Sequence, residues 1–503
     1  MNITESLSAR AHEIPDAPAV LTAEATLSYA ELDRAVSWTA GSFKKAGLAP
    51  GDIVGIHLSN QAQHLITSLA LARLGVGQIA FDGSDPPRLQ RELARRLKIV
   101  ATVADKSTKV KTGTPRVDPP SDRPGDFKRL NPVDLEPVSD GALPFLLLPT
   151  SGTTSGVPKV GLLTHAVAHP RLKHLVLDGP GSRFLSPINI NFTGAKLNAF
   201  RCLIFGGCLA FHEGQSPHTF VEFAAEHHIN YFYATPVHAA ALLSVAKENA
   251  ILFSGVEAFQ IGTALLPEIL RKKIQERLTP NLYIHYGTTE VGIIAVASPN
   301  LVRSVPGVVG NVVPGMQVEI IDEEGNPMPP GNVGRLRMKS AGMISGYVDE
   351  PAETTQAFRD GWFYAGDLAE FTPDGELIHH GRADDLMILD GINIYPGEIE
   401  NVLLRHPAVA EVAAFPIRSV ARGDVPIAAV VTKSQTSEDE LLSHCRSWLG
   451  LHAPHGLMIV PKLPRNAVGK VLKNELVRLF RRQLGKRQSE HSPDQGNRTR
   501  DAG

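Results

Sequence analysis

Residues 150–159, TSGTTSGVPK, place hydroxyl side chains, two glycines and a lysine directly after the apolar run 145–148. Glycine lets a backbone approach an anion closely, and hydroxyl and free N–H groups can surround phosphate oxygens. Lys159 adds a positive charge. The spacing differs from a Walker A loop, from a Gly-x-Gly-x-x-Gly turn and from a Gly-x-Ser-x-Gly elbow. On its own the loop suits either phosphate binding or an ordinary flexible turn.

Further polar motifs follow other apolar runs. They are YGTTE at 286–290, YAGD at 364–367, GRADD at 381–385, DGINIYPGEIE at 390–400 and LPRNAVGK at 463–470. Each has a plain interpretation when taken alone. Asp367 is typical of a turn, Arg382 of a surface, and Lys470 is one of 50 Lys and Arg residues. The histidine pairs at 227–228 and 379–380 lack the spacing of helical zinc ligands and favour ordinary core or surface positions.

In this order, the motifs resemble those of the ANL adenylate-forming superfamily, and most of all an AMP-forming acyl-CoA synthetase. The resemblance extends to about Arg482. It implies an α/β fold in which a large N-terminal domain of layered α/β subdomains carries a small β-barrel-like unit. A small, mobile α+β C-terminal domain follows. The expected boundaries are 1–381 for the adenylation domain, 382–486 for the mobile domain and 487–503 for a disordered tail.

The resemblance also implies the nucleotide site. Tyr286, within a motif that includes Gly287 and Thr288, would stack on adenine beside the segment Gly262, Thr263 and Ala264. Thr289 would contact the α-phosphate, and Glu290 would bind Mg²⁺ together with Thr154. Asp367 would bind the ribose hydroxyls and Arg382 would add a ribose or phosphate contact. The β- and γ-phosphates would be held by Thr150, Ser151, Gly152, Thr153, Thr154, Ser155, Gly156 and Lys159.

The resemblance also implies functions for the C-terminal motifs. Lys470 matches the family's catalytic lysine. Attack of a carboxylate on the α-phosphorus brings two anions together, so the step needs cations and Mg²⁺ where negative charge develops. Asp384 matches the hinge about which the C-terminal domain turns between half-reactions. The segment containing Gly391 would line the tunnel of the thiol acceptor.

Two departures from the family's pattern concern the loop and the acyl pocket. Ser155 makes the phosphate loop one residue longer than its commonest form, and Asn191 stands where a histidine is common. Residues 186–200 contain no Asp or Glu, which argues against an α-amino acid substrate. The pocket is expected to be mostly apolar, as suits a fatty or aromatic acid. Its expected residues are Asn191, Phe192, Ala195, Lys196, Leu197, Pro236, Ile293 and Ile294.

Lys196 is out of place in such a pocket. It would either pair with a second carboxylate or polar group of the substrate or point outward from a helix with its charge in water. Of these two interpretations the sequence favours the outward one.

Composition excludes several classes of protein. The chain has 503 residues and a net charge of −2, which argues against a nucleic-acid binder. Its three cysteines include no Cys-x-x-Cys pair, which fits a reducing compartment. No apolar run approaches the ~18 residues of a membrane span, and the N-terminus lacks a signal-peptide pattern. We therefore expect a cytoplasmic monomer or homodimer without an integral membrane segment.

The motifs need elements to position them. Ser28 and Glu31 form a capping-box pattern before a helix that ends near Lys45, and Asn60 can cap a second helix that ends near Leu74. Strands are expected at 53–57, 76–81 and 99–103, and their alternation with helices predicts parallel pairing. The proline-rich stretch 105–141 is expected to be a surface excursion. Short strands with Pro and Gly turns from about Val302 predict the antiparallel or barrel-like unit.

These observations predict an ATP- and Mg²⁺-dependent ligase that converts a carboxylic acid to an acyl-adenylate and transfers the acyl group to coenzyme A. Two alternatives stay open. One is a stand-alone ligase that loads an acyl carrier protein. The other is a non-catalytic sensor of nucleotide or acyl-adenylate.

Overall fold

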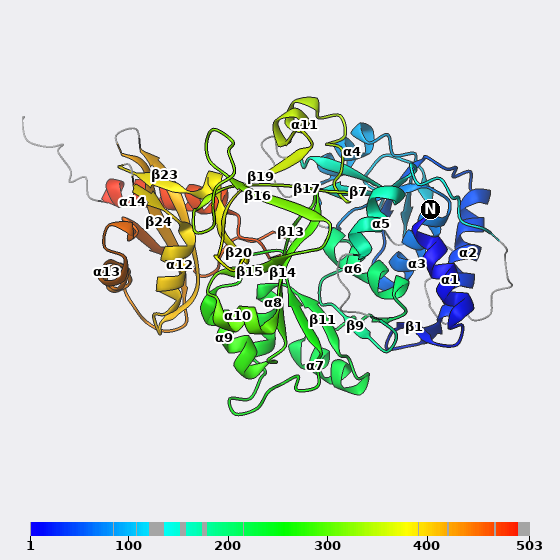
Figure 1. The fold of residues 1–503 in the computed structure, drawn as a ribbon, viewed down its shortest axis with the longest axis horizontal. Helices are drawn as coiled ribbons and strands as arrows, with labels where there is room; N and C mark the ends of the chain where they lie inside the picture. The colour runs from blue at the N-terminus through cyan, green and yellow to red at the C-terminus, as the bar shows by residue number, and fades with distance from the viewer. Residues whose placement is uncertain are drawn as a thin grey trace, which may run out of the picture. The chain divides into compact units, whose positions relative to one another are not determined.

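The computed structural model describes residues 2–83, 85–106, 108–119, 135–150, 157–173, 179–214, 216–390, 392–419, 422–466 and 469–490. The chain divides into two compact units (Figure 1). The first extends to His379 and the second begins at His380, with Pro267–Ile269 grouped with the second. No helix among these residues combines the length and the apolar character needed to cross a membrane.

A six-stranded sheet in the first unit holds the strand that leads into the phosphate-type loop. The sheet is parallel from β6 to β7, and only β8 is antiparallel to its neighbour. This confirms the parallel pairing predicted from helix–strand alternation. Strand β6 lies within the stretch predicted as a surface excursion; it is a two-residue edge strand, and its pairing with β5 was not predicted. The order is β6 (Arg116–Val117), β5 (Ala101–Ala104), β3 (Ile53–His57), β4 (Gly77–Ala80), β7 (Pro144–Pro149) and β8 (Val160–Thr164).

A second, larger sheet carries the motifs at 286–290 and 364–367. Its parallel part runs in the order β13 (Leu282–Thr288), β12 (Ala258–Ile261), β11 (Tyr231–Ala234), β9 (Arg183–Leu185), β10 (Cys208–Ala210) and β1 (Pro18–Leu21), with antiparallel β2 (Thr26–Ser28) at the edge.

Beyond β13 the same sheet becomes antiparallel, as predicted for the region after Val302. Its strands are β14 (Gly292–Ala297), β15 (Val308–Val312), β20 (Leu377–Arg382), β19 (Trp362–Phe371), β17 (Gly334–Ser340) and β16 (Met316–Ile321), and β18 (Phe358–Arg359) pairs with β19. Their inward side chains, which include Ile294, Met338 and Phe363, form a separate core.

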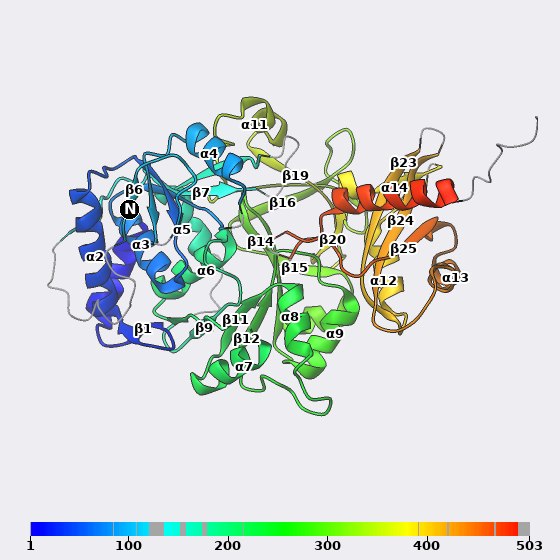
Figure 2. The ribbon, with the colours of Figure 1, turned by 180° about the vertical axis from the view of Figure 1, so that it is seen from behind.

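The helices of the first unit form layers on the two sheets (Figures 1 and 2). One large core joins α1, α2, α3 and α6 to both sheets, a second packs α7 and α8 on the opposite face of β11–β13, and a third packs α4 on the far face of the six-stranded sheet. The helices are α1 (Ile3–Glu13), α2 (Tyr29–Lys45), α3 (Gln61–Arg73), α4 (Pro87–Arg96), α5 (His165–Lys173), α6 (Thr193–Ile204), α7 (Pro217–Glu226), α8 (Pro236–Leu243), α9 (Glu268–Arg277), α10 (Pro299–Ser304) and α11 (Pro351–Ala357).

Local signals fix the ends of several helices. The Ser28 hydroxyl accepts a hydrogen bond from Glu31 N, and the Glu31 carboxylate accepts one from Ser28 N, which confirms the predicted capping box. Asn60 caps α3 as expected. Asn2 forms a capping box with Glu5 on α1, a helix that the sequence analysis did not anticipate.

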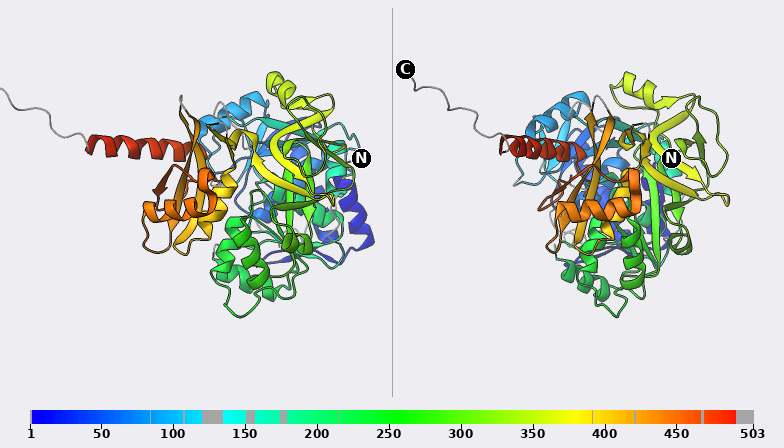
Figure 3. Two further views of the ribbon diagram at one scale, coloured as in Figure 1. Left: turned by 60° about the vertical axis from the view of Figure 1, so that its left-hand side comes forward. Right: turned by 90° about the vertical axis from the view of Figure 1, so that its left-hand side faces the viewer.

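The second unit is a compact α+β module (Figure 3). Helices α12 and α13 pack on one face of its five-stranded sheet and α14 packs on the other. The strands are β21 (Met387–Leu389), β22 (Ile392–Ile394), β23 (Val409–Ser419), β24 (Gly423–Thr432) and β25 (Gly456–Ile459); the helices are α12 (Pro396–Leu404), α13 (Glu438–Leu449) and α14 (Lys473–Glu490), with short 3₁₀ turns η2 (Ala383–Asp385) and η3 (Gly450–His452).

Candidate active site

The motif at 286–290 begins inside strand β13, which continues to Thr288, whereas the apolar pattern predicted a strand that ends at His285. The pairing of β13 with β14 is irregular between Tyr286 and Gly287. A Cβ atom on Gly287 would lie 2.4 Å from the carbonyl oxygen of Gly292, so only glycine fits there. This close turn places Thr289 and Glu290 just beyond the end of the strand.

Tyr347 connects two of the predicted site residues. Its hydroxyl donates a 2.8 Å hydrogen bond to Oε1 of Glu290, whose residue is only 8% exposed. The ammonium group of Lys159 lies 5.3 Å from the centre of the Tyr347 ring. The base of the phosphate-type loop and the predicted metal ligand are therefore neighbours in the fold, although 131 positions separate them in the chain. Tyr347 belongs to none of the sequence motifs, and no role was predicted for it.

Arg171, on α5, clamps the segment that carries Thr289 and Glu290. Its guanidinium donates to the carbonyl oxygens of Thr289 at 2.9 Å, Glu290 and Gly342. Burial lowers the pKa of Arg171 to about 10, while the nearby charge of Glu290 acts in the opposite direction. No sequence motif marks this arginine. The small residue Gly342 leaves the space for it, since a Cβ there would lie 2.7 Å from Arg171 Cγ.

Tyr286 and Asp367, the residues predicted to bind adenine and ribose, are in contact with each other. The Tyr286 hydroxyl donates a short hydrogen bond to Oδ2 of Asp367, which lies on β19 and is 5% exposed. His379, on β20, places Nε2 3.6 Å from the same Asp367 oxygen, and its ring centre lies 4.9 Å from that of Tyr286. His379 was predicted to be an ordinary core or surface histidine, and it is the pairing of distant strands that brings it to Asp367.

The segment Gly262–Thr263–Ala264 follows the end of β12. Thr263 has a φ of +74°, in the left-handed region that a β-branched residue rarely adopts. Such backbone strain is often found at ligand sites and costs about 1–3 kcal/mol. A Cβ on Gly262 would lie 3.1 Å from the Tyr233 hydroxyl and 3.4 Å from the His285 carbonyl oxygen, so glycine allows these elements to pack closely.

The phosphate-type loop is described only at its two ends. Thr150 N donates to the carbonyl oxygen of Lys159 at 2.8 Å, which closes the base of the loop. Ser151, Gly152, Thr153, Thr154, Ser155 and Gly156 lie outside the described residues, and so does Gly391. Their predicted contacts with phosphate, Mg²⁺ and the thiol acceptor stay predictions.

Five of the predicted acyl residues, 191–192 and 195–197, lie at the start of α6, whose N-cap is Phe192. Pro236 is the first residue of α8. Asn191 and Phe192 are half-buried and Ala195 is buried. Lys196 is 3% exposed, and its Nζ lies 2.8 Å from Nε2 of His64 on α3. The favoured interpretation of Lys196 as an outward-pointing lysine was therefore wrong, because α3 covers it. Ile293 and Ile294 both pack into the core of the antiparallel part of the large sheet.

In the second unit, the LPRNAVGK motif is described at residues 463–466 and 469–470, which bond to one another. Arg465 pairs with Glu411 and donates to the carbonyl oxygen of Gly469 at 2.6 Å. Asn466 and Lys470 exchange two hydrogen bonds, Lys470 N to Asn466 Oδ1 at 2.8 Å and Asn466 N to Lys470 O at 2.9 Å. The loop thus fixes the backbone of Lys470 and leaves its side chain exposed.

The predicted hinge lies in η2. Asp384 is 85% exposed along its side chain, and its carboxylate lies 3.5 Å from Arg382, which is 46% exposed. Such an exposed pair contributes little to stability. Its neighbour Asp385 pairs with Lys473 at 3.1 Å within the same unit.

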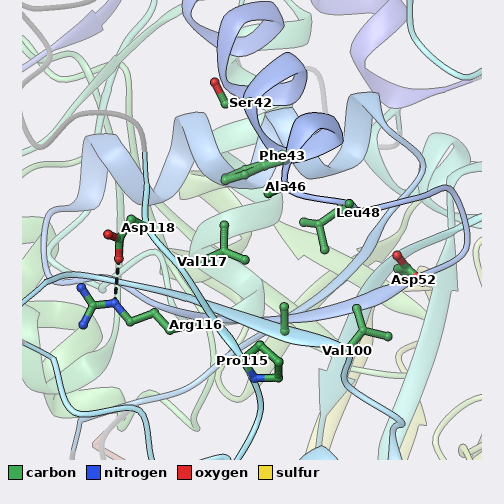
Figure 4. A pocket seen from close by; sticks show the side chains of 12 residues that line it. Ser42, Phe43, Ala46, Leu48, Asp52, Val100, Pro115, Arg116, Val117 and Asp118 are labelled. Atoms are coloured by element: carbon green, nitrogen blue, oxygen red, sulfur yellow. Dashed lines mark hydrogen bonds and ion pairs between the residues drawn. The ribbon is translucent and has the colours of Figure 1, made fainter.

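A groove of about 910 Å³ lies elsewhere in the first unit, between the end of α2 and strands β5 and β6 (Figure 4). Phe43, Leu48, Val100 and Val117 line its apolar part, and Arg116 pairs with Asp118 at its edge. None of the predicted site residues lines this groove.

Two family models match the chain. One, described as AMP-binding enzyme, matches residues 7–348, and the other, described as AMP-binding enzyme C-terminal domain, matches residues 398–470.

Individual proteins are similar over nearly the whole length. A feruloyl-CoA synthase from Amycolatopsis sp. is 28% identical over 496 residues, which cover 94% of this chain and 97% of that protein. A 2-succinylbenzoate–CoA ligase from Bacillus licheniformis is 27% identical over 488 residues, covering 93% and 98%. In fold, the chain resembles ATP-bound MatB from Rhodopseudomonas palustris with a TM-score of 0.85, at 24% identity and coverage of 95% and 99%.

Proposed function

The chain belongs to the AMP-binding enzyme family, and from this premise we propose that it activates a carboxylic acid with ATP and passes the acyl group to the thiol of coenzyme A. The geometry around Glu290 supports this proposal most strongly. Tyr347 bonds to the Glu290 carboxylate through its hydroxyl and faces Lys159 with its ring, and Tyr286 and Asp367 form a hydrogen-bonded pair suited to a nucleoside. The similar proteins are named as CoA synthases and ligases, which supports a thiol acceptor.

The first half-reaction forms the acyl-adenylate. A carboxylate oxygen of the acid attacks the α-phosphorus of ATP, the bond from that phosphorus to the bridging oxygen breaks, and pyrophosphate leaves. Thr289 would contact the α-phosphate, and the backbone that carries it is held by Arg171. Lys470 would stabilise charge on the phosphate oxygens, and Asp367 would orient the ribose as a double acceptor.

The Glu290 carboxylate suits Mg²⁺, a hard cation that prefers oxygen ligands. One of its oxygens accepts the Tyr347 hydroxyl, and the residue is largely removed from solvent. Bound there, Mg²⁺ would neutralise charge on the phosphates. Arg171 would keep Glu290 in place by holding its carbonyl oxygen.

The second half-reaction transfers the acyl group. The thiol sulfur attacks the carbonyl carbon of the adenylate, AMP leaves, and the thiol proton passes to solvent. The second unit would turn about Asp384 between the two half-reactions. The exposed, weakly held Arg382–Asp384 pair suits a segment that changes its backbone angles.

An assay of AMP release tests the acceptor. The purified chain is given ATP, Mg²⁺ and a panel of fatty, aromatic and dicarboxylic acids, with coenzyme A, a phosphopantetheinylated carrier protein or neither. We expect at least one acid to give AMP release that rises with coenzyme A and yields the acyl-CoA. If AMP release rose only with the carrier protein and not with coenzyme A, the carrier protein would be the acceptor.

A further inference from the structure

The segment 344–350 connects Glu290 to the strand that leaves the phosphate-type loop. At one end of the segment, Ile344 N donates a hydrogen bond to the carbonyl oxygen of Glu290 at 3.0 Å. Further along, Val348 N donates to the carbonyl oxygen of Val160, the first residue of β8, at 2.8 Å. The predicted metal ligand and the exit of the loop are therefore joined by one short stretch of backbone.

Arg96, the last residue of α4, ties this segment to the loop a second time. Its Nη1 donates to Oε1 of Glu350 at 2.7 Å, and its Nη2 donates to the carbonyl oxygen of Pro158 at 2.5 Å. The Arg96 side chain is 11% exposed and that of Glu350 is 26% exposed. A planar guanidinium can serve two acceptors at once in a fixed geometry, which the single ammonium of a lysine does less well.

Apolar packing holds the helix that carries Arg96. Leu93 of α4 is buried in the same core as Val160, and Val157 and Val348 pack against that core. Helix α4 thus covers both the end of the loop and the connecting segment, and it lies near the start of α11, which Glu350 precedes (Figures 1 and 2). The guanidinium is therefore placed by a packed helix and differs from an ion pair on the open surface.

The carbonyl group that Arg96 holds belongs to the peptide bond that precedes Lys159. The next carbonyl group, that of Lys159 itself, accepts from Thr150 N at 2.8 Å, and the Lys159 ammonium lies 5.3 Å from the centre of the Tyr347 ring. The backbone on both sides of Lys159 is thus fixed by hydrogen bonds. Lys159 is the described cation that the sequence predicts to bind the β- and γ-phosphates, so its placement bears directly on ATP.

We propose that Arg96 and Glu350 form a positioning pair for the phosphate-type loop. They hold the Pro158 carbonyl so that Lys159 meets the β- and γ-phosphates of ATP. This inference rests on the proposed function and adds to it two residues that belong to no sequence motif. Neither residue touches the substrate, because Arg96 acts through the Pro158 backbone and Glu350 acts through Arg96. AMP lacks the two outer phosphates, so its binding should not depend on the pair.

The test compares the binding of ATP with that of AMP. Equilibrium dialysis gives the Kd of each nucleotide with Mg²⁺ and without acid, so that no adenylate forms. The wild type is compared with Arg96→Met and with Arg95→Met. Arg95 is a matched control, since it is the adjacent arginine of α4 and its exposed side chain pairs with Glu92. Thermal unfolding checks that each variant folds, and pyrophosphate exchange gives the KM values for ATP and for the acid.

Arg96→Met should raise the Kd of ATP about tenfold, the scale of a lost charge-assisted hydrogen bond, and change the Kd of AMP less than about twofold. In pyrophosphate exchange, the KM for ATP should rise by a similar factor while the KM for the acid stays unchanged. Arg96→Lys keeps one donor and should recover part of the loss. It also keeps the test available if Arg96→Met fails to fold. Arg95→Met should bind both nucleotides like the wild type.

Glu350→Gln tests the second member of the pair. The amide oxygen still accepts from Arg96, so the Kd of ATP should rise only about threefold. When this change is combined with Arg96→Met, the Kd of ATP should equal that of Arg96→Met alone, because Glu350 acts through Arg96.

Three results would overturn the inference. They are unchanged ATP binding in Arg96→Met, an equal weakening of ATP and AMP binding in that variant, and a further loss of ATP binding when Glu350→Gln is added to it. Each of them leaves the proposed function intact, because that function is judged by exchange in the wild type. A wild type that binds both nucleotides and exchanges no pyrophosphate with any acid would contradict the proposed function, whereas the positioning role would still be decided by the Kd values.

Discussion

The nucleotide side of the first unit and the face of its large sheet that α6 covers differ in how their buried polar side chains are held. On the nucleotide side, Tyr286 bonds to Asp367 and Tyr347 bonds to Glu290, while Thr288 Oγ1 and His379 Nε2 have no hydrogen-bond partner among the described residues. On the face of β12 and β13 that points away from α7, both amide atoms of Gln260 and both ring nitrogens of His285 have no hydrogen-bond partner among the described residues. A nucleotide that is the same in every turnover can be bound by side chains that other residues already hold in place, as Tyr286 holds Asp367 and Tyr347 holds Glu290.

The comparison makes a clear experimental distinction. A variant on the nucleotide side should lower pyrophosphate exchange by the same factor for every acid. A variant at Gly194, which lies against Tyr233 in the predicted acyl segment, should change the order of the acids. The following variants test the first half of that statement, and a factor that differed between acids would break the comparison.

Lys470→Ala should have the largest effect. Loss of a cation that stabilises charge in the transition state should lower adenylation about a thousandfold for every acid. Thioester formation from preformed acyl-adenylate should be largely retained, since that step does not cleave the triphosphate. Lys462→Ala, at an exposed lysine eight positions earlier, is the control. Equal loss of both half-reactions would contradict the role of Lys470.

Glu290→Gln should follow. The change keeps the shape of the side chain and removes the charge that suits Mg²⁺, so exchange should fall about a hundredfold and be partly restored by higher Mg²⁺. The measurement is the rate of exchange across a Mg²⁺ titration. Glu324→Gln, at an exposed turn, should behave like the wild type. A rate that is insensitive to the Glu290 substitution would remove this residue from the site.

Arg171→Met should act mainly through structure. The variant leaves the carbonyl oxygens of Thr289, Glu290 and Gly342 without their donor, which should lower the free energy of unfolding by about 2–4 kcal/mol. Exchange should fall about tenfold because Thr289 and Glu290 lose their support. Denaturant unfolding checks the first effect, with Arg303→Met at an exposed site for comparison. Unchanged stability would show that the clamp contributes nothing.

Tyr347→Phe should have the smallest effect. It removes the hydroxyl that bonds to Glu290 and keeps the ring that faces Lys159. We expect about a threefold rise in the Mg²⁺ concentration needed for half-maximal exchange, with no change in preference among acids. Tyr347→Ala removes the ring as well and should be worse. If Tyr347→Phe and Tyr347→Ala needed the same Mg²⁺ concentration for half-maximal exchange, the contact of the ring with Lys159 would have no effect on exchange.

Much of the fold follows from local signals. Capping residues such as Ser28 and Asn60 mark helices α2 and α3 because their side chains bond to backbone groups a few positions away. Strand β6 escaped prediction because it has only two residues, Arg116 and Val117, and pairs with β5 across a proline-rich stretch. A pairing of that kind leaves no periodic pattern in the sequence.

The candidate site likewise contains residues that the sequence marks and residues that only the fold brings in. Tyr286, Glu290 and Asp367 could be singled out because they belong to motifs. Their supporting partners Arg171, Tyr347 and His379 could not, because strand pairing and helix packing bring them in from distant positions. Lys196 was misjudged for the same reason, since its burial depends on His64, 132 positions away in the chain.

Exchange of labelled pyrophosphate into ATP in the absence of any thiol acceptor tests the central claim most directly. With the wild-type chain, Mg²⁺ and a panel of acids that includes doubly anionic ones, we predict exchange that requires the acid and is lost in Glu290→Gln. A wild-type chain that binds ATP but gives no exchange with any acid would contradict the assignment of this site to acyl-adenylate formation.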